Sequence, residues 1–546
     1  MASSAIDGRQ LTALFIAGAA NLEANKDWIN ELNVFPVPDG DTGTNMTLTI
    51  KSAVKEVQDL GDTDNMKDIC KAMSSGSLRG ARGNSGVILS QLIRGFSKVA
   101  RDHDKLTVPI LADAFDRAVV TAYKAVMKPK EGTILTVAKA AADKSRELAD
   151  QGVTDLDEFF SQVLKEAEDV LAKTPDMLPV LKEAGVVDSG GEGLVQFMKG
   201  LYDKFQGKEI DYSALKTKHK EKEPKKEELR YLYRVKLSVV MPKKPSSGAQ
   251  KDYLEYLKSL GDKVKCGLDD GLLRVKLNTN DPGLIVTRSL KLGELGEVRI
   301  VNLREGVTPD KKERAAEPVE VKPDEPRKPA GFVSVSVGEG IGEIFKGLGV
   351  DQVISGGQTM NPSTQDVLAA IDSVNADTVY VLPNNKNIIM AAKQAAELTK
   401  DKKVVVIPTT TVPQGISAII SFMPDLDAES NLEGMTEEIA NVRSAEVTYA
   451  VRDTTIDGIE IHQGDIMGLG DNGILADGTD IEDVAFESLG KIIDDETEIV
   501  SIYYGEEVSE EDAEKLRERA AEAFPNCEVE LQYGGQPIYY YILSAE

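Results

Sequence analysis

The chain is organised around one stretch: Asn33-Val34-Phe35-Pro36-Val37-Pro38-Asp39-Gly40-Asp41-Thr42-Gly43-Thr44-Asn45-Met46. Two prolines stiffen the approach to its centre, where Asp39 and Asp41 flank a single glycine. Small and polar residues follow, and the segment from Asn45 onward can begin a helix. A rigid turn of this kind aims oxygen ligands at one point and follows them with backbone N–H groups. That combination suits a divalent cation that carries phosphates.

Size and charge limit the classes of protein to which the chain can belong. Its 546 residues are too many for one domain, and about three domains are expected. A formal net charge of -27 makes it a poor candidate for wrapping nucleic acid or binding acidic membranes. No apolar run approaches the roughly 18 residues that a membrane helix needs.

Cysteine and histidine are scarce, and this scarcity limits the cellular compartment and the metal sites that we expect. The three cysteines and three histidines are scattered along the sequence. Distant cysteines in odd number argue against a disulfide framework and favour a reducing cytoplasm. The first residues lack the basic and apolar pattern of a secretory signal, so we expect a cytoplasmic protein. A zinc site built from Cys and His is not expected.

The hydrophobic pattern divides the chain into three predicted domains joined by two linkers. Residues 8–205 are predicted to be all-α, with polar, glycine-rich breaks that could all lie at one end of a helical bundle. Residues 230–304 are predicted to form a small α+β domain of roughly ferredoxin-like element order. Residues 331–546 alternate strands and helices in a parallel α/β pattern and end in a further α+β portion. The linkers, 215–229 and 306–330, are dense in charge and proline.

Several local predictions bear on the site. Residues 8–30 and 175–184 are each predicted as one helix, and residues 75–86 as a glycine-rich loop between helices. In the third domain, polar loops are predicted at strand ends, at residues 355–364 and 383–386 among others. Ligands and partners meet such loops in open α/β sheets.

Asp39 and Asp41 are the strongest candidates for metal ligands, and Asn33 can add an amide oxygen. Hard oxygen ligands select Mg²⁺ over zinc, and a small protein ligand set leaves positions for phosphate oxygens. By itself an Asp-Gly-Asp triplet is more often a plain turn, so the assignment depends on neighbouring motifs.

Two glycine-rich segments are candidate phosphate sites. In Gly83-Asn84-Ser85-Gly86, the glycines let the backbone approach a phosphate, and Ser85 offers a hydroxyl at a helix N-terminus. A flexible connection between helices is an equal alternative. The second segment is Asp188-Ser189-Gly190-Gly191, which taken alone is better explained as helix caps.

As an ordered set, these motifs resemble a known family. Residues 8–205 resemble the nucleotide-binding domain of dihydroxyacetone kinases (DhaL type), an antiparallel helical barrel that binds ATP and Mg²⁺ at one end. The matching segments are Pro38–Met46, Gly83–Gly86, Gly132-Thr133-Ile134-Leu135-Thr136 and Asp188–Gly191. Nearly the whole chain is similar to the ATP-binding subunit of bacterial fatty acid kinase. That similarity rests on Asn33–Pro38, Arg82–Gln91 and Ser355–Thr364.

The resemblance implies roles for individual residues. Asp39 and Asp41 would hold Mg²⁺ and serve catalysis, and Asn33 falls near the position of a third ligand. The residues that would bind the nucleotide are Thr42, Gly43, Thr44, Asn45, Gly83, Asn84, Ser85, Gly86, Thr133, Asp188, Ser189 and Gly190.

The resemblance also implies an activity and partners. ATP would phosphorylate the carboxylate of a fatty acid presented by a separate fatty-acid-binding protein, and the product would be an acyl phosphate. Residues 230–304 would serve dimerisation, and residues 331–546 would dock the carrier. We expect a homodimer with no nucleic acid partner and no membrane span.

The chain departs from the family pattern in its middle domain. Several relatives have metal-ligating histidines before the segment that here reads Thr279-Asn280-Asp281-Pro282-Gly283, and a cysteine on the domain's first strand. Here Lys276 and Asn278 occupy the histidine positions, and the cysteine region reads Tyr231-Leu232-Tyr233. We therefore predict that no zinc is bound.

Two other functions are compatible with the same nucleotide domain. A kinase of dihydroxyacetone (glycerone) normally needs a separate part that traps the ketone on a histidine. His103, His219 and His462 lie in no such context. A nucleotide-sensing regulatory scaffold is the non-enzymatic alternative, against which the two aspartates and the phosphate loops argue.

Overall fold

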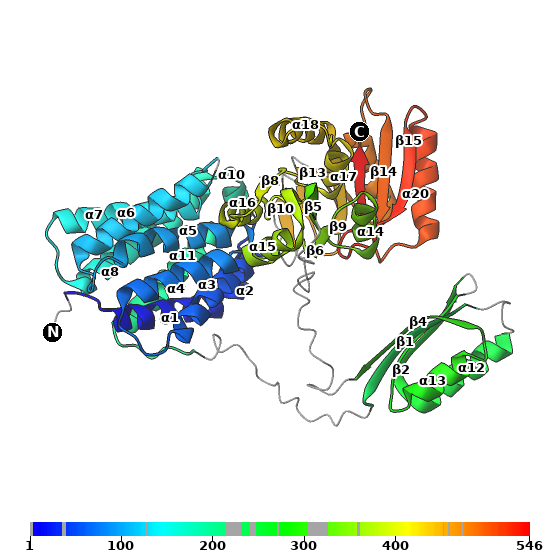
Figure 1. Ribbon diagram of the computed structural model, residues 1–546, viewed down its shortest axis with the longest axis horizontal. Helices are drawn as coiled ribbons and strands as arrows, with labels where there is room; N and C mark the ends of the chain where they lie inside the picture. Colours follow the sequence, from blue (N-terminus) through cyan, green and yellow to red (C-terminus); the bar gives the residue numbers. More distant parts are fainter. Residues whose placement is uncertain are drawn as a thin grey trace. The chain divides into compact units, whose positions relative to one another are not determined.

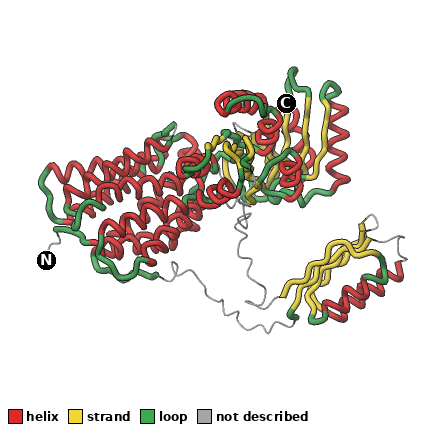
Figure 2. The backbone as a smooth tube through the Cα atoms, in the orientation of Figure 1, coloured by secondary structure: helices red, strands yellow, loops and turns green. Residues whose placement is uncertain are grey.

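The computed structural model describes residues 4–34, 40–126, 128–212, 231–240, 247–269, 272–302, 326–357, 361–450, 453–456, 459–470 and 473–546. The chain divides into two compact units, one combining Met1–Leu215 with Pro318–Glu546 and the other spanning Lys216–Glu317. Helices form the N-terminal part, and strands mix with helices in the rest (Figures 1 and 2). The predicted fold class, an all-α domain followed by mixed α/β regions, is confirmed.

The N-terminal part is helical throughout its described length. Its helices are α1 (Gly8–Ala24), α2 (Lys26–Glu31), α3 (Thr42–Asp59), α4 (Met66–Gly80), α5 (Gly83–Ala100), α6 (Val108–Ala125), α7 (Ile134–Asp150), α8 (Leu156–Leu171), α9 (Thr174–Met177), α10 (Pro179–Ala184) and α11 (Ser189–Phe205).

The long helices close into a ring. Helices α3 to α8 pack successively on one another, α11 packs on α7, α8 and α1, and α1 packs on α3. The seam between α1 and α11 is tight because Gly18 has no side chain. A Cβ there would lie 2.8 Å from the Phe197 ring. Phe15 also meets Phe197 edge to face, with ring centroids 5.7 Å apart. The ring has an apolar interior, and its helix ends carry the polar breaks.

Three local predictions for this domain differ from the structure. The single helix predicted for 8–30 is two helices that meet at Asn25, and the one predicted for 175–184 is α9 and α10. The glycine-rich loop predicted for 75–86 is mostly wrong, since α4 continues to Gly80. A Cβ on Gly76 would lie 2.6 Å from the Ala53 Cα, so this glycine allows two helices to pack closely and does not break one.

The second unit is an antiparallel sheet with helices on one face (Figure 1). Its elements are β1 (Tyr233–Val240), α12 (Ser247–Leu260), β2 (Gly261–Asp269), β3 (Leu272–Thr279), α13 (Pro282–Ser289) and β4 (Glu294–Asn302). The strand order is β2-β3-β1-β4. Buried Tyr253, Leu257 and Ile285 of the helices pack on alternate residues of β1 and β3. Strand β2 was missed because its charged residues hide the period-two pattern.

The C-terminal part begins with a parallel sheet, as predicted. Its elements are β5 (Lys328–Ser336), α14 (Glu339–Gly347), β6 (Gln352–Ser355), α15 (Thr364–Ser373), β7 (Ala376–Leu382), α16 (Ile389–Leu398) and β8 (Lys403–Val406). The strand order is β6-β5-β7-β8. Loops that follow β6 and β7 leave the sheet at the same edge, because parallel strands end on one side.

A second sheet completes the C-terminal part, with strand order β13-β12-β9-β16-β14-β15. Its elements and neighbours are α17 (Val412–Ile420), α18 (Ala428–Asn441), β9 (Arg443–Tyr449), β10 (Thr454–Ile456), β11 (Ile459–Ile461), β12 (Ile466–Gly470), β13 (Gly473–Gly478), α19 (Ile481–Ile492), β14 (Ile499–Tyr504), α20 (Glu510–Ala523), β15 (Glu528–Tyr533) and β16 (Tyr541–Ala545). In the described part of the chain, no helix has the length and apolar character to cross a bilayer.

Candidate nucleotide and metal site

Four helices of the N-terminal domain begin next to one another. They are α3, α5, α7 and α11, and each begins in one of the polar segments singled out by sequence. The first N–H groups of a helix lack partners within it, and its N-terminus carries a partial positive charge. Several such ends brought together form a site for a polyanion such as a nucleotide phosphate chain.

Glycines bring the start of α5 against α3. Gly83 has a φ of 57°, and a Cβ there would lie 2.4 Å from Asn45 Nδ2. At Gly86 a Cβ would lie 2.4 Å from Thr49 Oγ1. Thr49 also accepts a hydrogen bond of 3.3 Å from the Arg82 backbone N–H. The glycines predicted to admit a phosphate are therefore required first for this close packing.

Hydroxyl groups join the start of α11 to the start of α3. The buried Asn33 Oδ1 accepts from the Thr42 hydroxyl. The Ser189 hydroxyl lies 3.4 Å from the same amide oxygen and 3.3 Å from Thr42 Oγ1, so it can donate to either. Asn33 thus lies beside the starts of α3 and α11, and its amide oxygen organises two neighbouring side chains; its role as a metal ligand stays a prediction.

Asp188 joins α11 to α7. Its Oδ2 accepts from the Gly191 backbone N–H at 2.7 Å, and its carboxylate also accepts from the Ile134 backbone N–H. Its own N–H donates to Thr174 Oγ1 at 3.1 Å. Burial raises the pKa of the Asp188 carboxyl to about 6, while the two backbone hydrogen bonds lower it. Asp188 is therefore the N-cap of α11, and it lies close to Thr133, which is the N-cap of α7.

Thr44 and Gly43 pack against α2. The Thr44 N–H donates to Asn30 Oδ1 at 3.0 Å, and Asn30 Nδ2 donates to the Thr44 hydroxyl at 3.0 Å. A Cβ on Gly43 would lie 2.2 Å from the Lys26 carbonyl oxygen. Asn30 was not anticipated, because nothing in its local sequence marks it.

Asp41 is buried at the start of α3, 7% exposed. Its backbone carbonyl accepts from the Asn45 N–H at 2.8 Å, and its Oδ2 accepts from Asn361 Nδ2 at 2.5 Å. Asp39 lies outside the described residues, so its role stays a prediction. Among the described residues, no three His, Cys, Asp or Glu side chains gather as a metal cluster.

The C-terminal domain supplies further polar groups to this end of the barrel. Asn84 Nδ2 donates to Asn387 Oδ1 at 3.0 Å, and Gln394 Nε2 donates to the Leu78 carbonyl at 2.7 Å. Ala391 and its neighbour Met390 pack on Ala81 and Val87. Asn361 lies after β6, within the strand-end segment 355–364 that the sequence marked for ligands or partners, and Asn387 lies one residue beyond the segment 383–386 marked after β7.

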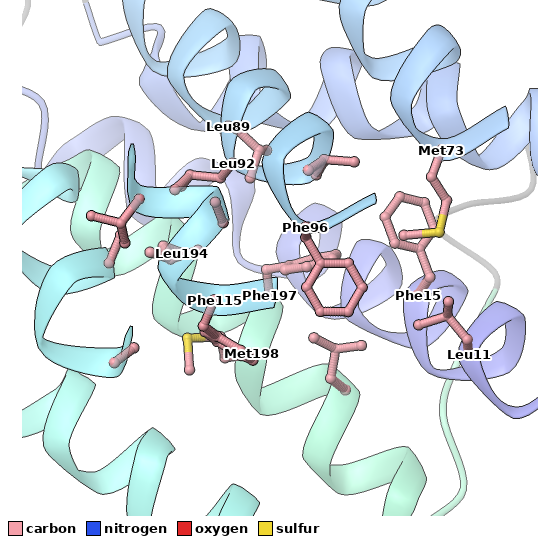
Figure 3. A pocket seen from close by; sticks show the side chains of 16 residues that line it. Leu11, Phe15, Met73, Leu89, Leu92, Phe96, Phe115, Leu194, Phe197 and Met198 are labelled. Carbon is pink, nitrogen blue, oxygen red and sulfur yellow. The ribbon is translucent and has the colours of Figure 1, made fainter. Parts of the chain in front are cut away.

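A separate cavity of about 130 Å³ lies inside the ring. The described residues that line it are all apolar, among them Phe15, Phe96, Phe115 and Phe197 (Figure 3). A phosphate buried there would lose its hydration without gaining a donor. The nucleotide candidate is therefore the polar end of the barrel and not this cavity.

Comparison with known protein families assigns two regions of the chain. Residues 331–546 match the model of the C-terminal region of FakA-like fatty acid kinase proteins, and residues 36–203 match the DAK2 domain. The chain belongs to the family of FakA-like fatty acid kinase proteins with a DAK2 domain.

Its similarity to individual relatives covers the full length. It is 42% identical over 557 residues to protein YloV of Bacillus subtilis, covering 100% of both chains. It is 39% identical over 552 residues to an uncharacterized protein of Staphylococcus aureus MRSA252, again covering 100% of both.

Two solved structures are each similar to a part of the chain. One is the dihydroxyacetone kinase of C. freundii in complex with AMP-PNP and Mg²⁺, at 15% identity and TM-score 0.29, covering 37% of this chain and 35% of that one. The other is the Streptococcus pneumoniae fatty acid kinase B3 protein loaded with linoleic acid. It shows 11% identity and TM-score 0.28, covering 40% of this chain and 99% of that one.

Proposed function

We propose that this chain is the ATP-binding component of a fatty acid kinase. It transfers the γ-phosphoryl group of ATP to the carboxylate of a fatty acid that a separate fatty-acid-binding protein presents. The observation that carries the proposal is the meeting of four helix N-termini beside the buried Asp41, in a chain of this family.

The residues present fit a magnesium–ATP complex. Asp41 offers a carboxylate, and Asn361 Oδ1 is a buried amide oxygen that accepts no hydrogen bond from the described residues. Mg²⁺, when bound, neutralises the phosphate charge that develops during transfer. Asp39 is the second carboxylate of the proposed ligand set.

The chain's own groups position the phosphates. Backbone N–H groups at the starts of α3, α5 and α11 would donate to phosphate oxygens, and glycine at positions 83 and 86 lets the start of α5 lie close to α3, so that these helix ends converge. A carboxylate oxygen of the fatty acid attacks the γ-phosphorus, the bond to the bridging oxygen breaks, and ADP leaves. No proton needs to be removed from the acceptor, so a general base is not required.

Exposed apolar side chains support the proposed roles of the other domains. Ile420, Met423 and Leu426 are 67%, 59% and 48% exposed where α17 leads into α18, and they give residues 331–546 a surface for the carrier protein. Val298 and Ile300 are 41% and 46% exposed on β4, and they give residues 230–304 an apolar contribution to a dimer interface.

The test is turnover of ATP by the purified full chain with a fatty acid, with and without a candidate carrier protein. Acyl phosphate should form only with the carrier, and Asp41→Ala should abolish its formation while circular dichroism stays unchanged. Dihydroxyacetone serves as the alternative acceptor. Turnover of dihydroxyacetone without any acyl phosphate would overturn the proposal.

A further inference from the structure

Asn361 reaches the kinase site from a different domain. Its side chain is 2% exposed, and its amide Nδ2 donates to Asp41 Oδ2 at 2.5 Å across 320 residues of sequence. Its backbone is fixed on both sides. The Asn361 carbonyl accepts from Arg82 Nη1 at 2.9 Å, and Ser363, two residues on, forms a capping box with Asp366 at the start of α15.

The other half of the Asn361 amide is its carbonyl oxygen, Oδ1. Its Oδ1 is buried and accepts no hydrogen bond from the described residues. Leaving such an acceptor unsatisfied is unfavourable, so buried orphan oxygens are rare unless a ligand completes them. A neutral amide oxygen beside a carboxylate is a typical pair of oxygen ligands for Mg²⁺.

A second contact follows the same pattern. Asn387 Oδ1 accepts from Asn84 Nδ2 at 3.0 Å, so the loop after β7 meets the start of α5 just as the loop after β6 meets the start of α3. Two amides from one edge of the parallel sheet therefore lie on two of the converging helix N-termini. A purely structural domain contact would not require polar groups at both of these places.

We propose that Asn361 is a positioning and ligand residue of the kinase site, supplied by the C-terminal domain, an inference that rests on the proposed function. Its N–H group holds the Asp41 carboxylate in place, and its Oδ1 is an oxygen ligand for the cation that arrives with ATP. By linkage, binding of the cation and nucleotide strengthens the contact between the two domains, and loss of that contact weakens cation binding by the same factor.

The test is the magnesium dependence of binding of a non-hydrolysable ATP analogue to the full chain, measured by calorimetry. Asn361→Ala should raise the magnesium concentration for half-saturation about tenfold, a typical effect of a residue that supports a metal site. Asn361→Asp keeps an oxygen ligand but loses the donor that holds Asp41, so its affinity should lie between those of Asn361→Ala and the unaltered protein. Gln394→Ala, in the same domain contact but bonded to Leu78, is the matched control and should change little.

The outcomes separate this inference from the function on which it rests. If Asn361→Ala binds magnesium and analogue like the unaltered protein, or if Asn361→Asp is worse than Asn361→Ala, Asn361 is no ligand. Asp41→Ala should lose binding in either case. If Asp41→Ala also binds normally, the proposed kinase site itself is wrong.

A second observation concerns a cleft of about 570 Å³ on the outer side of α4 and α5. Among the described residues, six basic residues line it, together with three serines and no carboxylate side chain. The basic residues are Lys67, Lys71, Arg79, Arg94, Lys98 and Arg101. Such a concentration of positive charge is unexpected in a chain of net charge -27.

Only part of this charge is neutralised by the protein. Arg79 pairs with Glu56 at 3.3 Å, and Arg101 pairs with Asp102 at 3.7 Å. Burial and the neighbouring cations, Arg94 foremost, lower the pKa of Lys98. The buried Ser97 hydroxyl, which also lines the cleft, has no hydrogen-bond partner among the described residues.

The geometry points to a binding site in this cleft for a small anion with several phosphate groups, separate from the kinase site. Inorganic tripolyphosphate, titrated by calorimetry in buffer without divalent cations, is the probe. Lys71→Glu should weaken its binding about tenfold or more, because the reversal changes two unit charges beside the anion. Lys165→Glu, on the exposed face of α8, is the control. Equal binding by the unaltered protein and Lys71→Glu would overturn the assignment.

Discussion

Asp188 carries a carboxyl group whose charge can be removed while its shape is kept. The side chain is buried and accepts from the backbone N–H groups of Gly191 and Ile134. Asparagine retains an acceptor oxygen for the same position. Asp188→Asn therefore isolates the cost of holding a negative charge in the interior of the barrel.

The cost in folding stability of the buried Asp188 charge follows from the pKa of its carboxyl group. Burial raises the pKa of Asp188 from 3.8 to about 6, so the folded state binds this proton more tightly than the unfolded state. The tighter proton binding stabilises the folded state fully at pH values below the pKa of Asp188 in the unfolded chain. This stabilisation is lost as the pH rises through the pKa of Asp188 in the folded protein. At about 1.36 kcal/mol per pH unit, the loss amounts to about 3 kcal/mol at neutral pH. The backbone hydrogen bonds from Gly191 and Ile134 are already included in this pKa.

We therefore expect Asp188→Asn to be more stable than the unaltered protein by about 2–3 kcal/mol at pH 7.5 and by about half as much at pH 5. The measurement is urea unfolding followed by fluorescence of Trp28, the single tryptophan, which lies in α2 of this domain. Its signal reports on the helical domain apart from the other domains.

Asp155→Asn is the matched control. Asp155 caps α8 through a hydrogen bond of 3.1 Å from the Asp157 N–H, but it is exposed. Because Asn and Asp are similar N-caps, the control should change stability little at either pH. The reasoning about Asp188 is refuted if Asp188→Asn is less stable than the unaltered protein at pH 7.5, or if its advantage is the same at both pH values.

Three further predictions concern the site and the middle domain. Gly83→Ala forces a side chain into a left-handed conformation 2.4 Å from Asn45, so the melting temperature and the affinity for an ATP analogue should both fall, with a stability loss of about 1–3 kcal/mol. An unchanged melting temperature would contradict the close packing. Asn33→Ala removes the acceptor near the Thr42 and Ser189 hydroxyls and should cost about 1–3 kcal/mol in urea unfolding, whereas a loss confined to metal affinity would assign Asn33 to the cation alone. Elemental analysis should find zinc well below one equivalent per chain, because Lys276 stands at a ligand position; stoichiometric zinc would refute this.

The α/β pattern of the C-terminal part illustrates what local sequence can predict. Residues 332–337 and 378–382 are short segments rich in valine, which is typical of strands, and residues 332–336 and 378–382 lie in strands of the parallel sheet. The helices α17, α18 and α19 were not anticipated. In α17 the apolar residues surround the helix, so no helical stripe is visible.

Glycines caused one of the errors in the helical domain. Gly76 and Gly80 looked like loop residues, but they lie inside α4, where the absence of a side chain lets α3 approach. A sequence shows that a glycine is present, and only packing shows whether its freedom serves a turn or a close contact.

The sequence by itself determined the order of the motifs, the class of each domain and the residue types available for phosphate and cation binding. These properties are local, because they depend on hydrophobic period, helix caps and the chemistry of single side chains. The tertiary structure alone decided that the segments at Asp41, Gly83 and Asp188 meet, and that Asn361 reaches Asp41. Contacts across hundreds of residues depend on how whole helices and sheets pack, and no local pattern in the chain encodes them.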